Sequence, residues 1–122
     1  MKLPTHKVSI AKINSQEWLF DELVLQIEKD FQLFDNQLVL REKNIRLLHD
    51  QLLSVLRVLL VQSPTTLNQL LYKIDVSEHL LKDQMDSGRY SSFEELCTSL
   101  IMEREVKKVI LRNVLSGKLL FS

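Results

Sequence analysis

The sequence has 122 residues, of which 45% are hydrophobic and 26% are charged. Sixteen basic and sixteen acidic residues cancel, so the overall charge demands neither a nucleic acid nor any other strongly charged partner. The single cysteine, Cys97, excludes an intramolecular disulfide and a metal site built from several cysteines.

Few residues in the chain interrupt a helix, since it has only two glycines and two prolines. Residues 1–13 contain three lysines and no acid, and we interpret them as a basic, flexible N-terminal tail. They lack the apolar core of a secretory signal. The densest apolar run, residues 52–61, contains Arg57 and is too short to cross a bilayer. We therefore expect a single helical domain over residues 14–122, a cytoplasmic location and no membrane partner.

The first predicted helix begins at Asn14, whose side chain can cap it, with Glu17 three residues later completing a capping box. Apolar residues then recur every three or four positions as far as Leu59. This seam fits one continuous helix over residues 14–62. It also fits two helices separated near "FDNQ", at residues 34–37.

We favour two helices, over residues 15–34 and 37–62, because their lengths then match those of the later helices. A third segment is predicted over residues 64–87, with Ser63 as its N-cap and Pro64 at its first position. Ser92 caps the last one, over residues 92–116. Four segments of similar length predict an all-α protein, specifically an antiparallel four-helix bundle.

Residues 66–85 allow two interpretations. Their apolar spacing fits a helix-turn-helix, the alternative function being a nucleic-acid-binding protein. However, residues 66–90 have a net charge of −1, from three basic and four acidic side chains, which opposes phosphate binding. The favoured interpretation is a helix kinked or broken near Asp75, with Asp75 as N-cap and Glu78 as its partner.

The nucleic-acid alternative would use side chains from two segments. Arg104, Lys108 and Arg112 lie four residues apart and would line one face of the last helix. Such a stripe is more often a solvated face whose cations suit the helix C-terminus. The candidate residues of this alternative are Ser77, His79, Lys82, Arg104, Lys108 and Arg112.

Apolar residues spread around most of the circumference in the second half of the last helix. A helix of this kind is buried on several sides, and we expect the chain's short tail or a second subunit to cover it. We predict a homodimer, since two-fold dimers are the commonest way to bury such a patch. The predicted interface residues are Val106, Val109, Leu119, Leu120 and Phe121.

Catalytic and cofactor motifs are missing from the sequence. No Glu-x-x-His pair suits a di-iron bundle, and two isolated glycines cannot form a phosphate-binding loop. Cys97 lies among leucines, with no histidine close in sequence to activate it, and is expected to be a buried core residue. We therefore predict a non-enzymatic protein without cofactor or metal, acting through protein–protein interaction. Its specific role is left open.

Overall fold

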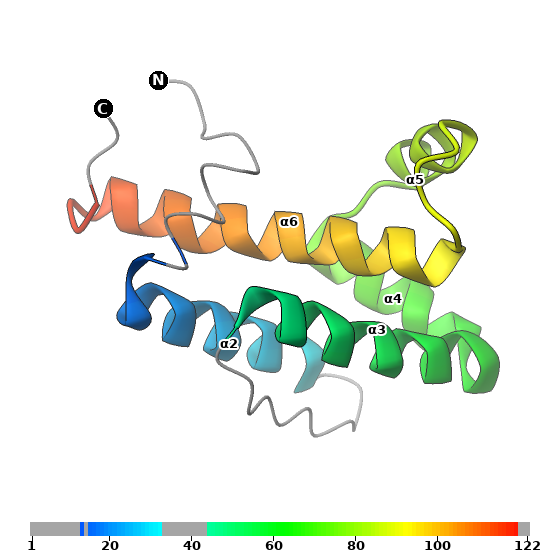
Figure 1. Cartoon of the computed structure of the whole chain (residues 1–122), viewed down its shortest axis with the longest axis horizontal. Coiled ribbons are helices and arrows are strands. Elements are labelled where there is room, and N and C mark those ends of the chain that lie inside the picture. The colour runs from blue at the N-terminus through cyan, green and yellow to red at the C-terminus, as the bar shows by residue number, and fades with distance from the viewer. Residues whose placement is uncertain (1–12, 14, 33–43, 120–122) are drawn as a thin grey trace.

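The computed structural model describes residue 13, residues 15–32 and residues 44–119, and all the regular structure described there is helical (Figure 1). The prediction of an all-α protein is confirmed. The described helices are α2 (Glu17–Phe31), α3 (Ile45–Gln62), α4 (Pro64–Ile74), α5 (Glu78–Asp86) and α6 (Phe93–Leu115).

Helix α6 is the centre of the structure, because it packs against α2, α3, α4 and α5. Helices α2 and α3 each also pack against α4. Helix α5 stands at one end of the molecule, beside the N-terminal half of α6 (Figure 1). This central position explains why apolar residues surround α6: its neighbours lie on several sides.

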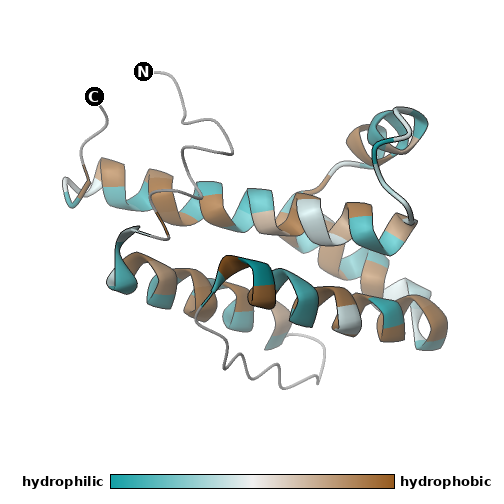
Figure 2. Ribbon diagram, viewed as in Figure 1, coloured by the Kyte–Doolittle hydropathy of each residue, from teal (hydrophilic) through white to brown (hydrophobic). Residues whose placement is uncertain are grey.

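The core is built mainly from leucine and isoleucine side chains supplied by all five helices. Figure 2 shows hydrophobic and hydrophilic bands alternating along the helices, as expected where one side faces the core and the other faces solvent. Many of these side chains are completely removed from solvent, and each buried leucine or isoleucine contributes about 1.5–3 kcal/mol. Examples are Leu23, Ile27, Leu52, Leu56, Leu70 and Ile101.

Local signals in the sequence located several helix ends correctly. Pro64 occupies the first turn of α4 after the N-cap Ser63. The Ser92 hydroxyl accepts a hydrogen bond from the backbone N–H of Glu95, which opens α6 as predicted. Gly88 and Gly117 follow the ends of α5 and α6 with φ values of 72° and 81°, in the left-handed conformation that glycine adopts readily.

The predicted break near Asp75 is confirmed, but the role assigned to Asp75 is wrong. Asp75 has φ 72° and ψ 46°, so it ends α4 in the left-handed conformation instead of capping the next helix. Its backbone N–H donates to the carbonyl of Tyr72 at 3.1 Å. Ser77 is the N-cap of α5, and its hydroxyl accepts from the N–H of Leu80 at 3.1 Å.

The first half of the chain differs from both predicted arrangements. Asn44 has an extended backbone, and its side chain accepts from the N–H of Arg46 at 2.8 Å, so α3 begins at Ile45. One continuous helix over residues 14–62 is therefore wrong, as is an uninterrupted second helix over residues 37–62. The predicted break at residues 34–37 lies outside the described residues.

The start of α2 was also predicted too early. Its N-cap is Gln16, which makes no capping hydrogen bond through its side chain. The predicted cap at Asn14 and most of the predicted tail, residues 1–12, lie outside the described residues. Ile13, which the prediction assigned to that tail, is fully buried in the core.

Candidate functional site

A groove of about 410 Å³ lies between the C-terminal part of α4 and the start of α5. Four apolar side chains and four polar ones line it: Leu71, Tyr72, Val76 and Leu81, with Asn68, Asp75, Ser77 and Glu78. It coincides with the stretch whose spacing resembled a helix-turn-helix. Its volume falls within the range of about 300–1,000 Å³ that is usual for ligand sites in proteins.

The turn at Asp75 creates this groove. After the left-handed residue, the N–H of Val76 donates to the Leu71 carbonyl at 2.9 Å, so the chain leaves α4 sharply. Val76 and Leu81 are then 7% and 8% exposed, and they anchor the start of α5 to the core. Because α5 packs on α6, an apolar hollow remains between α5 and the end of α4.

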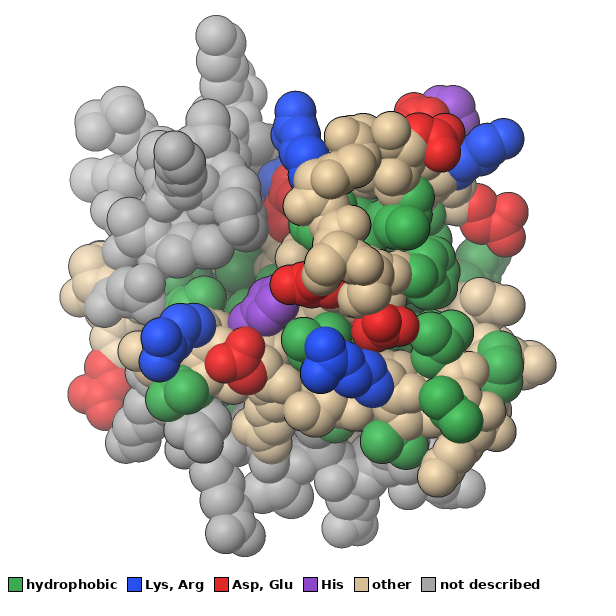
Figure 3. Space-filling model, turned by 45° about the vertical axis from the view of Figure 1, so that its right-hand side comes forward, with side chains coloured by type: hydrophobic (Ala, Val, Ile, Leu, Met, Phe, Trp, Pro, Cys, Tyr) green, Lys and Arg blue, Asp and Glu red, His purple; other side chains and the backbone are tan. Residues whose placement is uncertain are grey.

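Tyr72 is the most exposed large hydrophobic side chain among the described residues, at 89%. Its ring belongs to the groove lining, next to the nearly buried Leu71. Figure 3 brings the α5 end of the molecule forward and shows hydrophobic side chains gathered beside that helix, with acidic ones near them. Exposed tyrosine beside an apolar hollow is typical of protein interfaces, where its ring supplies contact area and its hydroxyl a hydrogen bond.

The groove is acidic. Asp75 and Glu78 are its charged lining residues, and both are exposed. The C-terminus of α4 and the N-terminus of α5 meet here, so the negative end of one helix dipole and the positive end of the other oppose each other. Arg104 of α6 lies 3.3 Å from Asp75, but both side chains of this pair are largely exposed, so the pair contributes little stability. A cationic group in the groove would therefore interact with Glu78 and would compete with Arg104 for Asp75.

The basic stripe predicted on α6 is occupied by carboxylates of the same chain. Arg104 pairs with Asp75 at the groove. Lys108 lies 3.4 Å from Asp30 and 3.1 Å from Glu105. These carboxylates offset the positive charge of the stripe, so its attraction for a phosphate backbone is reduced.

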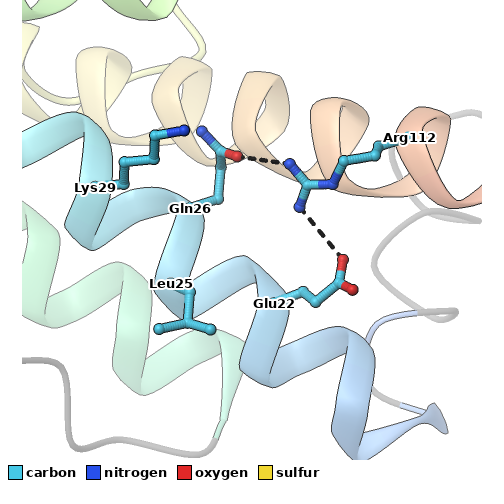
Figure 4. A pocket seen from close by; sticks show the side chains of 5 residues that line it. All are labelled: Glu22, Leu25, Gln26, Lys29 and Arg112. Carbon is cyan, nitrogen blue, oxygen red and sulfur yellow. Dashed lines mark hydrogen bonds and ion pairs between the residues drawn. The ribbon is translucent and has the colours of Figure 1, made fainter.

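The third cation of the stripe, Arg112, also has partners on α2. It lies 3.3 Å from a carboxylate oxygen of Glu22 and donates to the side-chain oxygen of Gln26 at 2.9 Å (Figure 4). These residues, with Leu25 and Lys29, line a shallow pocket of about 180 Å³. A hydrogen bond from Asn113 lowers the pKa of Glu22, and Arg112 acts in the same direction against the opposing effect of burial.

The α5 residues of the nucleic-acid alternative are likewise explained without a nucleic acid. Ser77 is the N-cap of α5. The exposed His79 lies 3.2 Å from Asp83, one turn later. Lys82 is exposed, but it shares this short helix with Glu78 and other acids, so α5 presents no positive face.

The predicted interface residues are mostly core residues. Val106 and Val109 are fully buried within the single chain, and Leu119 is only 5% exposed. Leu120 and Phe121 lie outside the described residues. The apolar circumference of α6 was read correctly, but neighbouring helices of the same chain cover it. Leu115, at 73% exposed, is the large apolar side chain that α6 leaves in solvent.

Sequence reasoning missed a buried pair of carboxyl groups, Asp30 on α2 and Glu105 on α6, which are 5% and 0% exposed. Burial raises the pKa of Glu105 to about 8, and the neighbouring Asp30 adds to the rise while Lys108 opposes it. Burial would also raise the pKa of Asp30, but hydrogen bonds from Glu105 and Gln26 and the charge of Lys108 lower it. One signal was present: Glu105 lies three residues after Met102 and four before Val109, on an apolar face.

Cys97 is buried, as expected, and burial raises the pKa of its thiol to about 12, with Glu94 adding to the effect. It is therefore protonated and unreactive at neutral pH. In the described part of the chain, no three His, Cys, Asp or Glu side chains gather where they could hold a metal ion. No helix there is both long enough and apolar enough to cross a membrane.

Comparison with protein-family models, with curated proteins and with solved structures found no match for this chain.

Proposed function

We propose that this chain is a non-enzymatic protein-binding domain, and that the groove between α4 and α5 is its binding site. The occupant is a peptide segment of a partner protein that carries a large apolar side chain next to a lysine or arginine. The exposure of Tyr72 beside an apolar groove is the observation that carries this proposal.

The apolar part of the occupant follows from the groove lining. Leu71, Val76 and Leu81 form a nearly buried floor, and Tyr72 stands exposed beside them. An inserted apolar side chain would remove part of the Tyr72 ring from water, which contributes about 25 cal/mol per Å² of apolar surface. Tyrosine is also among the residues that most often dominate the binding energy of protein interfaces.

The cationic part of the occupant follows from charge complementarity. Asp75 and Glu78 line the groove, and no lysine or arginine does, although Arg104 of α6 pairs with Asp75 from outside the lining. A partner with an acidic segment would be repelled, so the charge supplies selectivity as well as affinity.

We further propose that α2, α3, α4 and α6 form the predicted antiparallel four-helix bundle, as a rigid scaffold for the groove. Two observations support this. Helices α2 and α3 run in one direction in Figure 1, and α4 and α6 run in the other. Each of α2 and α3 packs against both α4 and α6. The predicted cytoplasmic location is likewise kept as a proposal.

The test is a selection from a displayed library of random peptides on the full chain, followed by affinity measurement for the enriched peptides. We expect enriched peptides to combine a large apolar residue with a nearby lysine or arginine. Tyr72→Ala should weaken their binding at least about tenfold, the loss expected when a central aromatic residue of an interface is truncated. Leu25→Ala is the matched control, because Leu25 is 65% exposed on α2, outside the groove.

The charge is tested separately. Glu78→Gln should weaken binding of the same peptides several-fold, whereas Asp86→Asn, which removes an exposed acid of α5 outside the groove lining, should not. Enriched peptides that bind Tyr72→Ala as tightly as the wild-type chain would overturn the proposal.

A second copy of the chain is the alternative occupant. The predicted homodimer would then form through the groove and not through the last helix and the tail. Arg57, Val58 and Val61 are exposed on α3 and have the chemistry that the groove favours. Sedimentation equilibrium distinguishes the two occupants. A mass that stays at 14.3 kDa at high concentration excludes the second copy. A larger mass that Tyr72→Ala restores to 14.3 kDa identifies it as the occupant.

A further inference from the structure

Asp30 and Glu105 lie at a point where three helices are tied together. Lys108 Nζ on α6 lies 3.1 Å from Glu105 Oε1 and 3.4 Å from Asp30 Oδ2. Lys73 of α4 lies 3.8 Å from Asp30 Oδ1, and Gln26 of α2 donates to Asp30 Oδ2 at 3.1 Å. These are the charged and polar groups that α2, α4 and α6 bring to the two buried carboxyls.

The two carboxyl groups are unequally supported. Asp30 receives a hydrogen bond from Gln26 and has two lysines nearby, so its negative charge is well stabilised. Neither carboxyl oxygen of Glu105 accepts a well-oriented hydrogen bond, although Lys108 lies close. A charge on Glu105 would be buried without hydrogen bonds, which is strongly unfavourable.

The proton therefore belongs on Glu105. A protonated Glu105 would have an O–H to offer to the nearby Asp30 carboxylate, which agrees with a pKa of about 8 for Glu105 and a lowered pKa for Asp30. Loss of this proton to solvent would leave two adjacent carboxylates between α2 and α6. Like charges that share one site disfavour each other's ionisation.

We propose that the Glu105–Asp30 contact is a proton-operated latch that holds the C-terminal turn of α2 on α6 while Glu105 is protonated, and loosens it when Glu105 ionises. Helix α2 is the element that gives way, because α6 is held by four helices whereas α2 packs on α4 and α6. The latch goes beyond the proposed peptide binding and does not depend on it.

The test follows two NMR signals of the full chain across a pH titration: the carboxyl carbon of Glu105 and the methyl groups of Ile27, one turn before Asp30. We expect the Glu105 carboxyl to titrate near pH 8, and the Ile27 methyl signals to shift and broaden over the same range. In Glu105→Gln, which is neutral at every pH, the Ile27 signals should not respond in this range. Asp30→Asn should lower the titration midpoint of Glu105, because the neighbouring negative charge is removed.

Glu22→Gln is the matched control, since Glu22 also joins α2 to α6 but its side chain is 27% exposed. That variant should keep both responses. A Glu105 midpoint near its ordinary value, or Ile27 signals that stay unchanged while Glu105 titrates, would overturn the latch. Should Glu105→Gln fail to fold, the wild-type and Asp30→Asn titrations still decide the question.

Discussion

Asp75 adopts a backbone conformation that few residues other than glycine tolerate. Its φ of 72° lets the chain turn from α4 toward α5, and aspartate is among the side chains that occupy this region most readily. The cap of α5 is supplied two residues later by Ser77. The two residues therefore have different roles that single substitutions can separate.

Ser77→Ala should lower the free energy of unfolding by about 1 kcal/mol, because the N–H of Leu80 loses its acceptor. Asp75→Gly should leave it unchanged or raise it slightly. Glycine relieves left-handed strain of about 1 kcal/mol, while the exposed ion pair with Arg104 contributes less than about 1 kcal/mol. Urea denaturation of both variants gives the comparison. If Asp75→Gly lowered the free energy of unfolding by more than Ser77→Ala, Asp75 would be the N-cap of α5 after all.

Glu105 makes the stability of the whole chain depend on pH. Its pKa is raised from 4.5 in the unfolded chain to about 8 in the folded one. The folded state thus holds a proton that the unfolded state has already lost, and the free energy of unfolding falls as pH rises from 4.5 to about 8. Asp30 acts oppositely: its pKa is lowered, so its contribution is lost as pH falls through the folded value, below 3.8.

The free energy of unfolding should therefore fall by up to a few kcal/mol between about pH 5 and pH 8, since one pKa unit corresponds to about 1.4 kcal/mol. Glu105→Gln should remove most of this slope, and Glu22→Gln should keep it. Urea denaturation at several pH values measures the slope directly. A wild-type chain that is equally stable across this range would contradict the assignment of the proton to Glu105.

At the scale of the elements, the apolar pattern of α6 can be read from neighbouring residues in the sequence. The contacts that explain this pattern involve distant parts of the chain. Its apolar circumference predicted burial on several sides, but the sequence could not indicate which surfaces provide it. Contacts with α2, α3, α4 and α5 join residues far apart in the chain. The same limit hid the pairing of Glu105 with Asp30, whose positions differ by 75 residues.

Helix ends were predictable where the signal lies within a few residues. Ser63 with Pro64, Ser92 with the N–H of Glu95, and Gly88 each depend on local geometry, and the structure bears them out. The sequence "DVS" offered two capping residues two positions apart, and composition could not choose between Asp75 and Ser77. The groove was not predicted because its shape depends on how α5 packs against α6, a contact between two separate helices.

Because α6 is buried by its own chain, a charge at Val109 should unfold the protein instead of splitting a dimer. Val109→Glu should lower the free energy of unfolding by more than about 3 kcal/mol, since it places an unpaired charge in the core. Leu115→Glu on the same helix should stay within about 0.5 kcal/mol, because Leu115 is 73% exposed. Circular dichroism during chemical denaturation measures both. A folded, stable Val109→Glu variant would contradict the burial of Val109 in the core and would support its predicted place in an interface.

At the scale of the whole molecule, the described helices have different roles. Helices α2, α3, α4 and α6 bury most of the apolar core, while α5 attaches at one end and leaves a groove against α4. The latch between α2 and α6 involves Lys73 of α4, the residue next to Tyr72. Arg104, Lys108 and Arg112 of α6 are paired with acids of the same chain, and one of these acids, Asp75, also lines the groove beside Glu78.

The central claim is that the groove between α4 and α5 receives a cationic, apolar peptide. Its most direct test is an NMR titration of the isotope-labelled full chain with a peptide from the selection described above. The account predicts that the perturbed backbone signals concentrate on Leu71, Tyr72, Val76 and Leu81, and that Tyr72→Ala requires at least about tenfold more peptide for the same perturbation. Signals that instead move around Leu25 and Arg112, with the groove residues unchanged, would contradict it.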